Sequence, residues 1–421
     1  MSRSTVLWIS SALVGLLCFG LAMALNQSML RADFYALLSL EGIGYDRGMS
    51  ERANRAAARP GGSPVVVLEV AETTLGDPAF RESPESFIPG LKGPLRYRKH
   101  ERAYHARVVD NLRKLGAAVV VFDMVFDEPD PEVDVHFARA IKAHGKVILA
   151  AANDAGTLKD GSAERTISVQ PPTETLRVAA AGMGAVVVPL DVDRTLRRFM
   201  WWSVGIHPET LEDTEIPSLG VAGAALYGGA PPDTVIAQEV KPKGTFLGRP
   251  IVGMQDADFG SLGSYIRFNG PSGSPAGAGS VAAYEEVFHV GDPSAEDPGR
   301  DERLRQQLAG KIVVIGNSSA VAQDRHRVPV FSRSRELGTT QEMPGVEVQA
   351  HMLQTALTGQ YPRLAGEHLQ VLLLLGCCLL TALLGRMLSP GPLVVAGLLA
   401  AVGLWVGSIQ LLSHQLVFLE P

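Results

Sequence analysis

Residues 105–129 read HARVVDNLRKLGAAVVVFDMVFDEP, and this stretch decides the fold. Its first half belongs to a segment, Lys99–Leu115, whose apolar residues recur about every three positions, as they do on one face of a helix. Gly116 follows this segment, and glycine is a common helix stop because it adopts the left-handed conformation. The next segment, Val119–Asp123, is an unbroken apolar run closed by an acid, which is typical of a strand buried on both faces. A helix that leads directly into such a strand predicts a parallel sheet covered by helices.

The same succession of segments extends on both sides of this stretch. Further apolar runs predict strands at Val65–Val70, Val147–Ala151, Ala185–Val188, Tyr265–Phe268 and Ile312–Ile315. Apolar residues at helical spacing predict helices at Asp134–His144, Thr173–Ala181 and Pro344–Thr358. We therefore predict an α/β domain over residues 61–365 with a mainly parallel sheet.

Three longer apolar runs flank this domain, at Val6–Leu25, His368–Leu388 and Leu393–Leu412. Each is close to the ~20 residues that a helix needs to cross the hydrocarbon core of a bilayer. They predict all-α transmembrane segments, with an N-terminal anchor at 1–27, a linker at 28–60 and two C-terminal helices at 366–388 and 393–412. A cleaved signal peptide is the alternative for the first run, but the run is longer than the apolar part of such a peptide, about 7–15 residues.

The basic residues beside these runs predict the orientation of the chain in a membrane. Arg3 precedes the first run and Arg386 lies at the turn between the second and the third. Because arginine next to a span favours the cytoplasmic side, we expect the α/β domain on the opposite side. The frequent alanine, glycine and arginine are typical of a bacterial protein. The predicted location is the bacterial inner membrane, multi-pass, with the large domain in the periplasm or outside the cell.

Composition excludes several classes of function. The net charge is -6, which gives no indication of a nucleic-acid partner. The three cysteines, Cys18, Cys377 and Cys378, all lie in the predicted spans. The α/β domain therefore has no disulfide and no thiolate metal site, and its stability must come from its apolar core.

Polar residues follow the predicted strands at the points where the strands end. These candidates for ligand binding are Glu69, Asp123, Asp127, Asn269, Asn317 and Asp324. Ligands of open parallel sheets bind beyond the carboxyl ends of the strands, so we expect a crevice there that accepts a small, unidentified ligand. The alternative for each residue is a structural role, because Asp and Asn often cap helices and turns just after strands. Asp123 directly follows an apolar run, so it requires a partner or a ligand if it is buried.

Other patterns predict no catalytic residue, no cofactor and no metal. Glu347 and His351 have the i, i+4 spacing of a helical metal site, but an ion pair or a packing role is more common for such a pair. The segment Gly310–Ser319 lacks the glycine and lysine spacing of a phosphate-binding loop. No nucleophile elbow of the Gly-x-Ser-x-Gly type is present.

A family resemblance emerges from an ordered set of motifs. They are an opening strand at 64–69, the stretch at 105–129, then KVILAAA at 146–152, PSLGVAGA at 217–224, IRFNGP at 266–271, LAGKIVVIGNS at 308–318 and MPGVEVQAHML at 343–353. In this order, after one apolar run and before two more, they resemble the CHASE2 domains, which are extracytoplasmic sensor domains of bacterial transmembrane receptors.

This resemblance implies a function as the input half of a receptor. Members of the family relay a ligand or stress signal to a cytoplasmic adenylate cyclase, guanylate cyclase or kinase, and such receptors resemble homodimers. The family typically has three spans after the sensor, whereas this sequence has two, and residues 416–421 look like the start of a third. We expect the output in a segment beyond residue 421 or in a separate cytoplasmic partner protein. The alternative function is a membrane-anchored envelope scaffold that binds other proteins and senses nothing.

Overall fold

The computed structural model describes most of the chain. It covers residues 35–57, 63–76, 97–157, 165–191, 193–206, 213–238, 244–256, 261–273, 280–292, 297, 299–319, 324–334, 338–365, 367–387 and 390–418. The chain divides into two compact units, Ala53–Tyr361 and a second unit made of Met1–Arg52 with Pro362–Pro421. The predicted α/β class with a mainly parallel sheet is confirmed for the larger unit.

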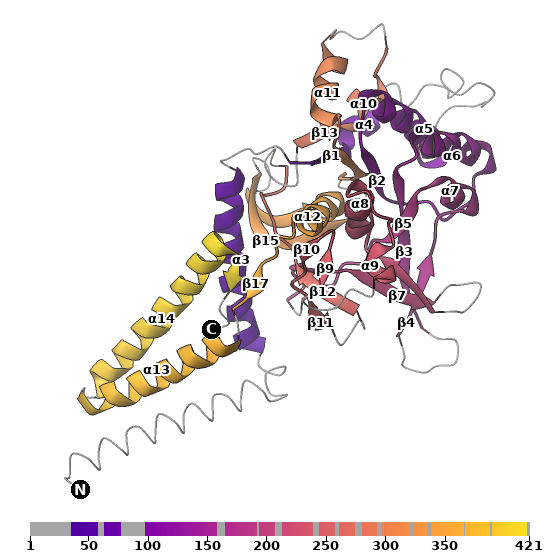
Figure 1. Cartoon of the computed structure of the whole chain (residues 1–421). Coiled ribbons are helices and arrows are strands. Elements are labelled where there is room, and N and C mark those ends of the chain that lie inside the picture. The colour runs from indigo at the N-terminus through magenta and orange to yellow at the C-terminus, as the bar shows by residue number, and fades with distance from the viewer. Residues whose placement is uncertain are drawn as a thin grey trace. The chain divides into compact units, whose positions relative to one another are not determined.

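The centre of the larger unit is a sheet of six parallel strands (Figure 1). In spatial order these are β13 (Ser280–Ala283), β1 (Val65–Val70), β14 (Ile312–Asn317), β2 (Val119–Val125), β3 (Val147–Thr157) and β5 (Gly182–Ala185). The second half of β3 also pairs in antiparallel fashion with β4 (Arg165–Gln170), and the sheet continues through β7 (Trp202–Ile206) and β8 (Asp213–Pro217).

Helices cover both faces of the parallel strands. One face packs on α5 (Tyr97–Leu115), α6 (Pro131–His144), α7 (Glu174–Ala179), α10 (Tyr284–Phe288) and α11 (Arg300–Leu308). The other packs on α8 (Leu219–Tyr227) and α12 (Gly345–Thr358) (Figure 1). Successive side chains of a strand point to opposite faces, so Val120 and Phe122 contact the first group and Val121 contacts α8. Burial on both faces explains why these strands are unbroken apolar runs.

The core on the α5 side holds a buried ion pair and a group of aromatic rings. The Nη1 of Arg102 in α5 lies 2.6 Å from Oδ1 of Asp134 in α6, and both side chains are almost completely buried. The His105 ring packs edge-on against Phe122 and Phe126, and its Nδ1 lies 2.6 Å from the hydroxyl of Tyr284. Burial, followed by the charge of Arg102, lowers the pKa of His105 to about 3, so this histidine is neutral.

Smaller elements surround the α12 side of the sheet. Three strands, β6 (Arg198–Met200), β11 (Met254–Asp256) and β12 (Ser261–Tyr265), form an antiparallel sheet. A hairpin of β15 (Arg325–Ser334) and β16 (Gly338–Pro344) leads directly into α12. The remaining short elements of this unit are α4 (Glu72–Gly76), α9 (Thr234–Ala237), β9 (Thr245–Phe246) and β10 (Arg249–Pro250).

Two predicted strands differ from the observed elements. The segment Tyr265–Phe268 forms no strand beyond Tyr265, because its next backbone N–H groups donate elsewhere: that of Ile266 to the carbonyl of Arg197, and that of Arg267 to the Thr355 hydroxyl of α12. The strand expected at Ala185–Val188 lies earlier, as β5. The predicted helices match α5, α6, α7 and α12 to within three residues at each end.

The described residues of the second unit form three helices, α3 (Tyr35–Ala57, which continues into the larger unit), α13 (Glu367–Met387) and α14 (Pro390–Gln415). The segment expected as a linker, 28–60, therefore includes a helix. Gly48 of α3 lies directly against Leu412 of α14, and β17 (Arg363–Leu364) pairs with β18 (Val417–Phe418).

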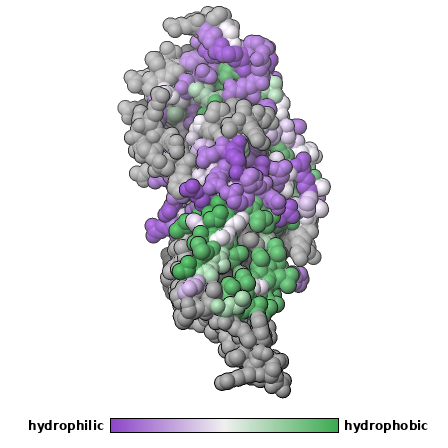
Figure 2. Space-filling model, turned by 90° about the vertical axis from the view of Figure 1, so that its left-hand side faces the viewer, coloured by the Kyte–Doolittle hydropathy of each residue, from purple (hydrophilic) through white to green (hydrophobic). Residues whose placement is uncertain are grey.

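One helix among the described residues is long and apolar enough to cross a membrane, at Val395–Gln415. The apolar part of α13 is shorter, Val371–Leu384, because polar residues occupy both ends of this helix. The predicted anchor at 1–27 lies outside the described residues. Large apolar side chains of α13 and α14 are exposed, among them Leu372, Leu399 and Val402, and Figure 2 shows hydrophobic side chains gathered in one zone of the surface.

Candidate functional site

Two acids lie in line at the carboxyl ends of the central strands. The strand register places Glu69 of β1 beside Gly316 of β14, and Gly316 beside Asp123 of β2. Side chains alternate between the two faces of a strand, and Glu69, Gly316 and Asp123 each occupy a position that faces α12 and α8. Both acidic side chains therefore point to that face. A Cβ on Gly316 would lie 2.6 Å from the Cβ of Val346, so glycine at this position allows the first turn of α12 to lie against the sheet.

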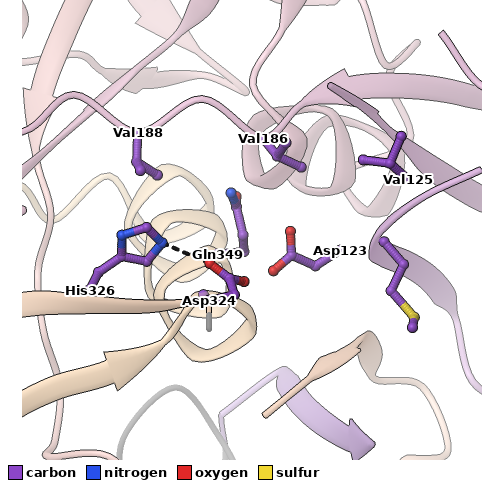
Figure 3. Close-up of a pocket in the computed structure, with 9 residues that line it drawn as sticks. Asp123, Val125, Val186, Val188, Asp324, His326 and Gln349 are labelled. Atoms are coloured by element: carbon purple, nitrogen blue, oxygen red, sulfur yellow. Dashed lines mark hydrogen bonds and ion pairs between the residues drawn. The ribbon is translucent and has the colours of Figure 1, made fainter. Parts of the chain in front are cut away.

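A pocket opens beside Asp123, between the strand ends and α12 (Figure 3). It has a volume of about 240 Å³. Its lining residues come from β2, from the segment after β5, from the start of β15 and the residue before it, and from α12: Asp123, Met124, Val125, Val186, Val188, Asp324, His326, Gly345 and Gln349. Polar groups therefore form one part of the wall and aliphatic side chains form the rest.

The carboxyl groups of Asp123 and Asp324 point toward each other across this pocket (Figure 3). Burial, followed by the negative charge of Asp324, raises the pKa of Asp123 to about 8. The Asp123 side chain is therefore a neutral carboxylic acid at pH 7, although it keeps partial contact with solvent. The Oδ1 of Asp324 lies 3.0 Å from Nε2 of His326, which positions the Asp324 carboxylate.

Gln349 supplies a further polar group to the pocket. Its side chain is 4 % exposed, and its Oε1 has no hydrogen-bond partner among the residues that the structure describes. A buried carbonyl oxygen without a donor is unfavourable by about 1–3 kcal/mol, and this oxygen is closed off from the pocket as well as from bulk solvent.

A second acid pair lies one strand away, between Glu69 and Glu347 of α12. Glu347 accepts hydrogen bonds from the Ser272 hydroxyl at 2.7 Å and from the Gly273 N–H, and Glu69 accepts one from Ser318 at 3.1 Å. Burial, followed by the nearby Glu69 carboxyl, raises the pKa of Glu347 to about 7, and burial also raises the pKa of Glu69. The two carboxyl groups are therefore coupled, because ionisation of Glu69 disfavours ionisation of Glu347.

Two of the six predicted site residues, Asp123 and Asp324, meet in the pocket. Glu69 instead faces Glu347. Asn317 has a capping role, since its Oδ1 accepts hydrogen bonds from the N–H and hydroxyl of Ser319. The other two predicted residues also lie away from the described lining of the pocket: Asn269 donates to Gln354 Oε1 of α12 at 2.7 Å, and Asp127 is exposed after β2.

The i, i+4 pair on α12 has divergent contacts. His351 is completely buried, its Nδ1 accepts a hydrogen bond from the Asn269 N–H at 3.4 Å, and burial lowers its pKa to about 3. Glu347, in contrast, contacts Glu69 and the loop at Ser272. Among the described residues, no group of three or more His, Cys, Asp or Glu side chains is arranged to hold a metal ion.

Sequence reasoning missed the contributions of Gln349, Val186 and Val188 to the pocket. Gln349 carries one available signal, since it is a polar residue within the largely apolar segment GVEVQAHML at 345–353. The two valines were expected in a strand, and no local pattern distinguishes a valine that lines a pocket from one in a core.

The comparisons with known proteins give one match. The family model described as CHASE2 domain matches residues 14–384, which is most of the chain. No curated protein and no solved structure matches this sequence.

Proposed function

The chain belongs to the CHASE2 domain family, whose members are extracellular sensory modules, and from this premise we propose that it is the extracytoplasmic sensor of a bacterial transmembrane receptor. The observation that carries the proposal is the extent of the match. It begins at residue 14, within the first apolar run, and ends at residue 384, at the end of the apolar part of α13. The apolar segments on both sides of the α/β domain therefore belong to the same module as the domain.

In this proposal the chain is a multi-pass protein of the bacterial inner membrane, with the α/β unit in the periplasm or outside the cell. The apolar helix Val395–Gln415 and the exposed leucines of α13 support a membrane location. Arg3 and Arg386 support the orientation. The output is an adenylate cyclase, a guanylate cyclase or a kinase, beyond residue 421 or in a separate protein, and the receptor acts as a homodimer.

The acid pair suggests how the sensor transmits its state. Glu69 lies on β1, which follows α3 after seven residues, and Glu347 lies on α12, which precedes α13 by eight residues. A stimulus that moves α12 relative to β1 therefore acts on the two chain segments that lead to the flanking helices. Such a stimulus shifts the receptor only if it binds the two arrangements with different affinity.

Cysteine labelling in intact cells tests the membrane topology. Asp127→Cys places a thiol on the exposed segment after β2, and Arg386→Cys places one near the end of α13. A membrane-impermeant maleimide should label the first variant in spheroplasts and the second only after permeabilisation. Labelling of Arg386→Cys in intact spheroplasts, or protection of Asp127→Cys, would contradict the proposed orientation.

A chimeric receptor tests sensing. Residues 1–387 are joined to the catalytic domain of an adenylate cyclase, and cyclic AMP is measured in a bacterium that lacks its own enzyme. Glu347→Ala breaks the acid pair on α12 and should change cyclic AMP output severalfold, whereas Asp127→Ala removes an exposed carboxylate and should leave the output unchanged. Equal output from both variants, at equal amounts in the membrane, would favour the scaffold alternative.

A further inference from the structure

We infer that the pocket formed by Asp123, Asp324 and Gln349 binds a small organic cation, a primary amine with a short aliphatic chain. The physiological meaning of this binding rests on the proposed sensor function, but the binding itself does not. Three features of the pocket support the inference: its hydrogen-bonding groups, its apolar wall and its charge.

The main acceptors in the wall of the pocket are two carboxyl groups. Those of Asp123 and Asp324 point toward one another (Figure 3), and the almost completely buried side chain of Gln349 lines the pocket beside them. A primary ammonium group has three N–H donors and no acceptor, so it can donate hydrogen bonds to both carboxyl groups at once. An anion would be repelled by Asp324.

The apolar part of the wall matches an aliphatic chain. Val125, Val186 and Val188 lie around the acids, and Met124 adds a flexible side chain. The volume, about 240 Å³, is below the range of roughly 300–1,000 Å³ that is typical of pockets for drug-sized ligands. The ligand is therefore small, with a charged end at the acids and a short carbon chain against the valines.

The charge of the pocket also favours an organic cation over other ligands. The titratable groups among the described lining residues are Asp123, Asp324 and His326. Because the pKa of Asp123 lies near 8, a bound ammonium group would favour its ionised form, and binding at pH 7 would release a proton. A metal ion is a poorer fit, since the described His, Asp and Glu side chains offer no group of three ligands.

Titration calorimetry of the full chain in detergent at pH 7 tests the inference, with n-butylammonium chloride as the probe. We expect saturable binding of butylammonium and none of n-butanol or butyrate, which have the same chain length. The heat should depend on the ionisation enthalpy of the buffer, because a proton is released. Asp324→Asn should raise the Kd by about tenfold or more, as expected for loss of a hydrogen bond to a charged group.

Matched variants and salts separate the outcomes. Asp127→Asn removes an exposed carboxylate outside the described lining of the pocket and should leave the Kd unchanged. Thermal unfolding checks that each variant is folded. Absence of saturable butylammonium binding to the folded wild-type protein overturns the inference, as does equal binding of butanol, or binding of Mg²⁺ or K⁺ in place of the amine.

The result is independent of the signalling test. If butylammonium binds but Glu347→Ala leaves the output of the chimera unchanged, the amine site stands and the sensor function fails. If the output changes but no amine binds, the sensor function stands and the ligand class is wrong.

Discussion

Replacing Asp123 by asparagine should remove much of the pH dependence of the free energy of unfolding between pH 5 and pH 7. The basis is the position of this acid at the end of β2, where burial and the charge of Asp324 raise its pKa from 3.8 to about 8. The folded protein therefore holds a proton on Asp123 over this range, whereas the unfolded chain has released it. Stability consequently falls as the pH rises from 3.8 towards 8.

The magnitude follows from the difference in bound protons. One additional proton in the folded state lowers the free energy of unfolding by ~1.4 kcal/mol per pH unit, or ~2.7 kcal/mol between pH 5 and pH 7. Because the Asp123 side chain keeps partial contact with solvent, we expect about half of this, ~1.4 kcal/mol. Asparagine has the shape of the neutral carboxylic acid but does not titrate. The two proteins should therefore be similar in stability at pH 5, and the variant should be more stable at pH 7.

Thermal unfolding of the full chain, followed by near-ultraviolet circular dichroism in detergent, measures this difference. At about 2–4 °C per kcal/mol, the gap in Tm between variant and wild type should grow by about 3–6 °C from pH 5 to pH 7. The Glu69–Glu347 pair titrates in both proteins and so cancels from the comparison. Asp127→Asn, which changes an exposed carboxylate, should follow the wild type. Parallel curves of Tm against pH for wild type and Asp123→Asn would refute the reasoning.

Three further predictions concern the core around the site and are tested by the same unfolding assay. Gly316→Ala should destabilise the protein by about 1–3 kcal/mol at every pH, because the new Cβ would lie 2.6 Å from that of Val346; an unchanged Tm would contradict the close approach of α12. Arg102→Met should be destabilising by about 3–5 kcal/mol, since it leaves Asp134 buried without its ion-pair partner, and a further change of Asp134 to leucine should recover part of the loss. His105→Phe should reduce the loss of stability in acid. In the wild type the folded state keeps this ring neutral down to a pKa of about 3, so its contribution to the free energy of unfolding is complete above pH 6.5 and is lost as the pH drops towards 3. Equal loss of stability in acid for wild type and variant would show that another group is responsible.

The sequence predicts the central strands well where both faces are covered by helices. β1, β2 and β14 appear as unbroken apolar runs for that reason, and their positions were predicted to within two residues. The start of β5 is predicted three residues too late, because the strand contains Gly182 and Gly184 and glycine has a low strand propensity. A Cβ on Gly184 would lie 2.5 Å from the Cα of Leu219, so close packing against α8 requires a residue of low strand propensity.

The site was only partly predictable for a related reason. The rule that ligands bind beyond the carboxyl ends of parallel strands identifies Asp123 directly. It cannot identify Gln349 or Glu347, because these residues reach the strand ends only through the close contact between α12 and Gly316. Asn269 and Asn317 lie at strand or segment ends like Asp123, but each has hydrogen-bond partners within the domain. Position along the chain therefore predicts the edge of the sheet, whereas the tertiary contacts decide which polar groups remain available.

This availability is the main argument that Asp123 has a role beyond structure. A structural acid at such a position would have a donor, as Asp134 has in Arg102, Thr173 and the Asp130 N–H. Among the described residues no hydrogen bond reaches the Asp123 carboxyl, and the charged group that acts on its pKa is another carboxylate, that of Asp324. An asparagine would fill the same space without the pH-dependent loss of stability. An acid that destabilises the fold at neutral pH and faces a second carboxylate is better explained by a cationic ligand that stabilises both carboxylates when it binds.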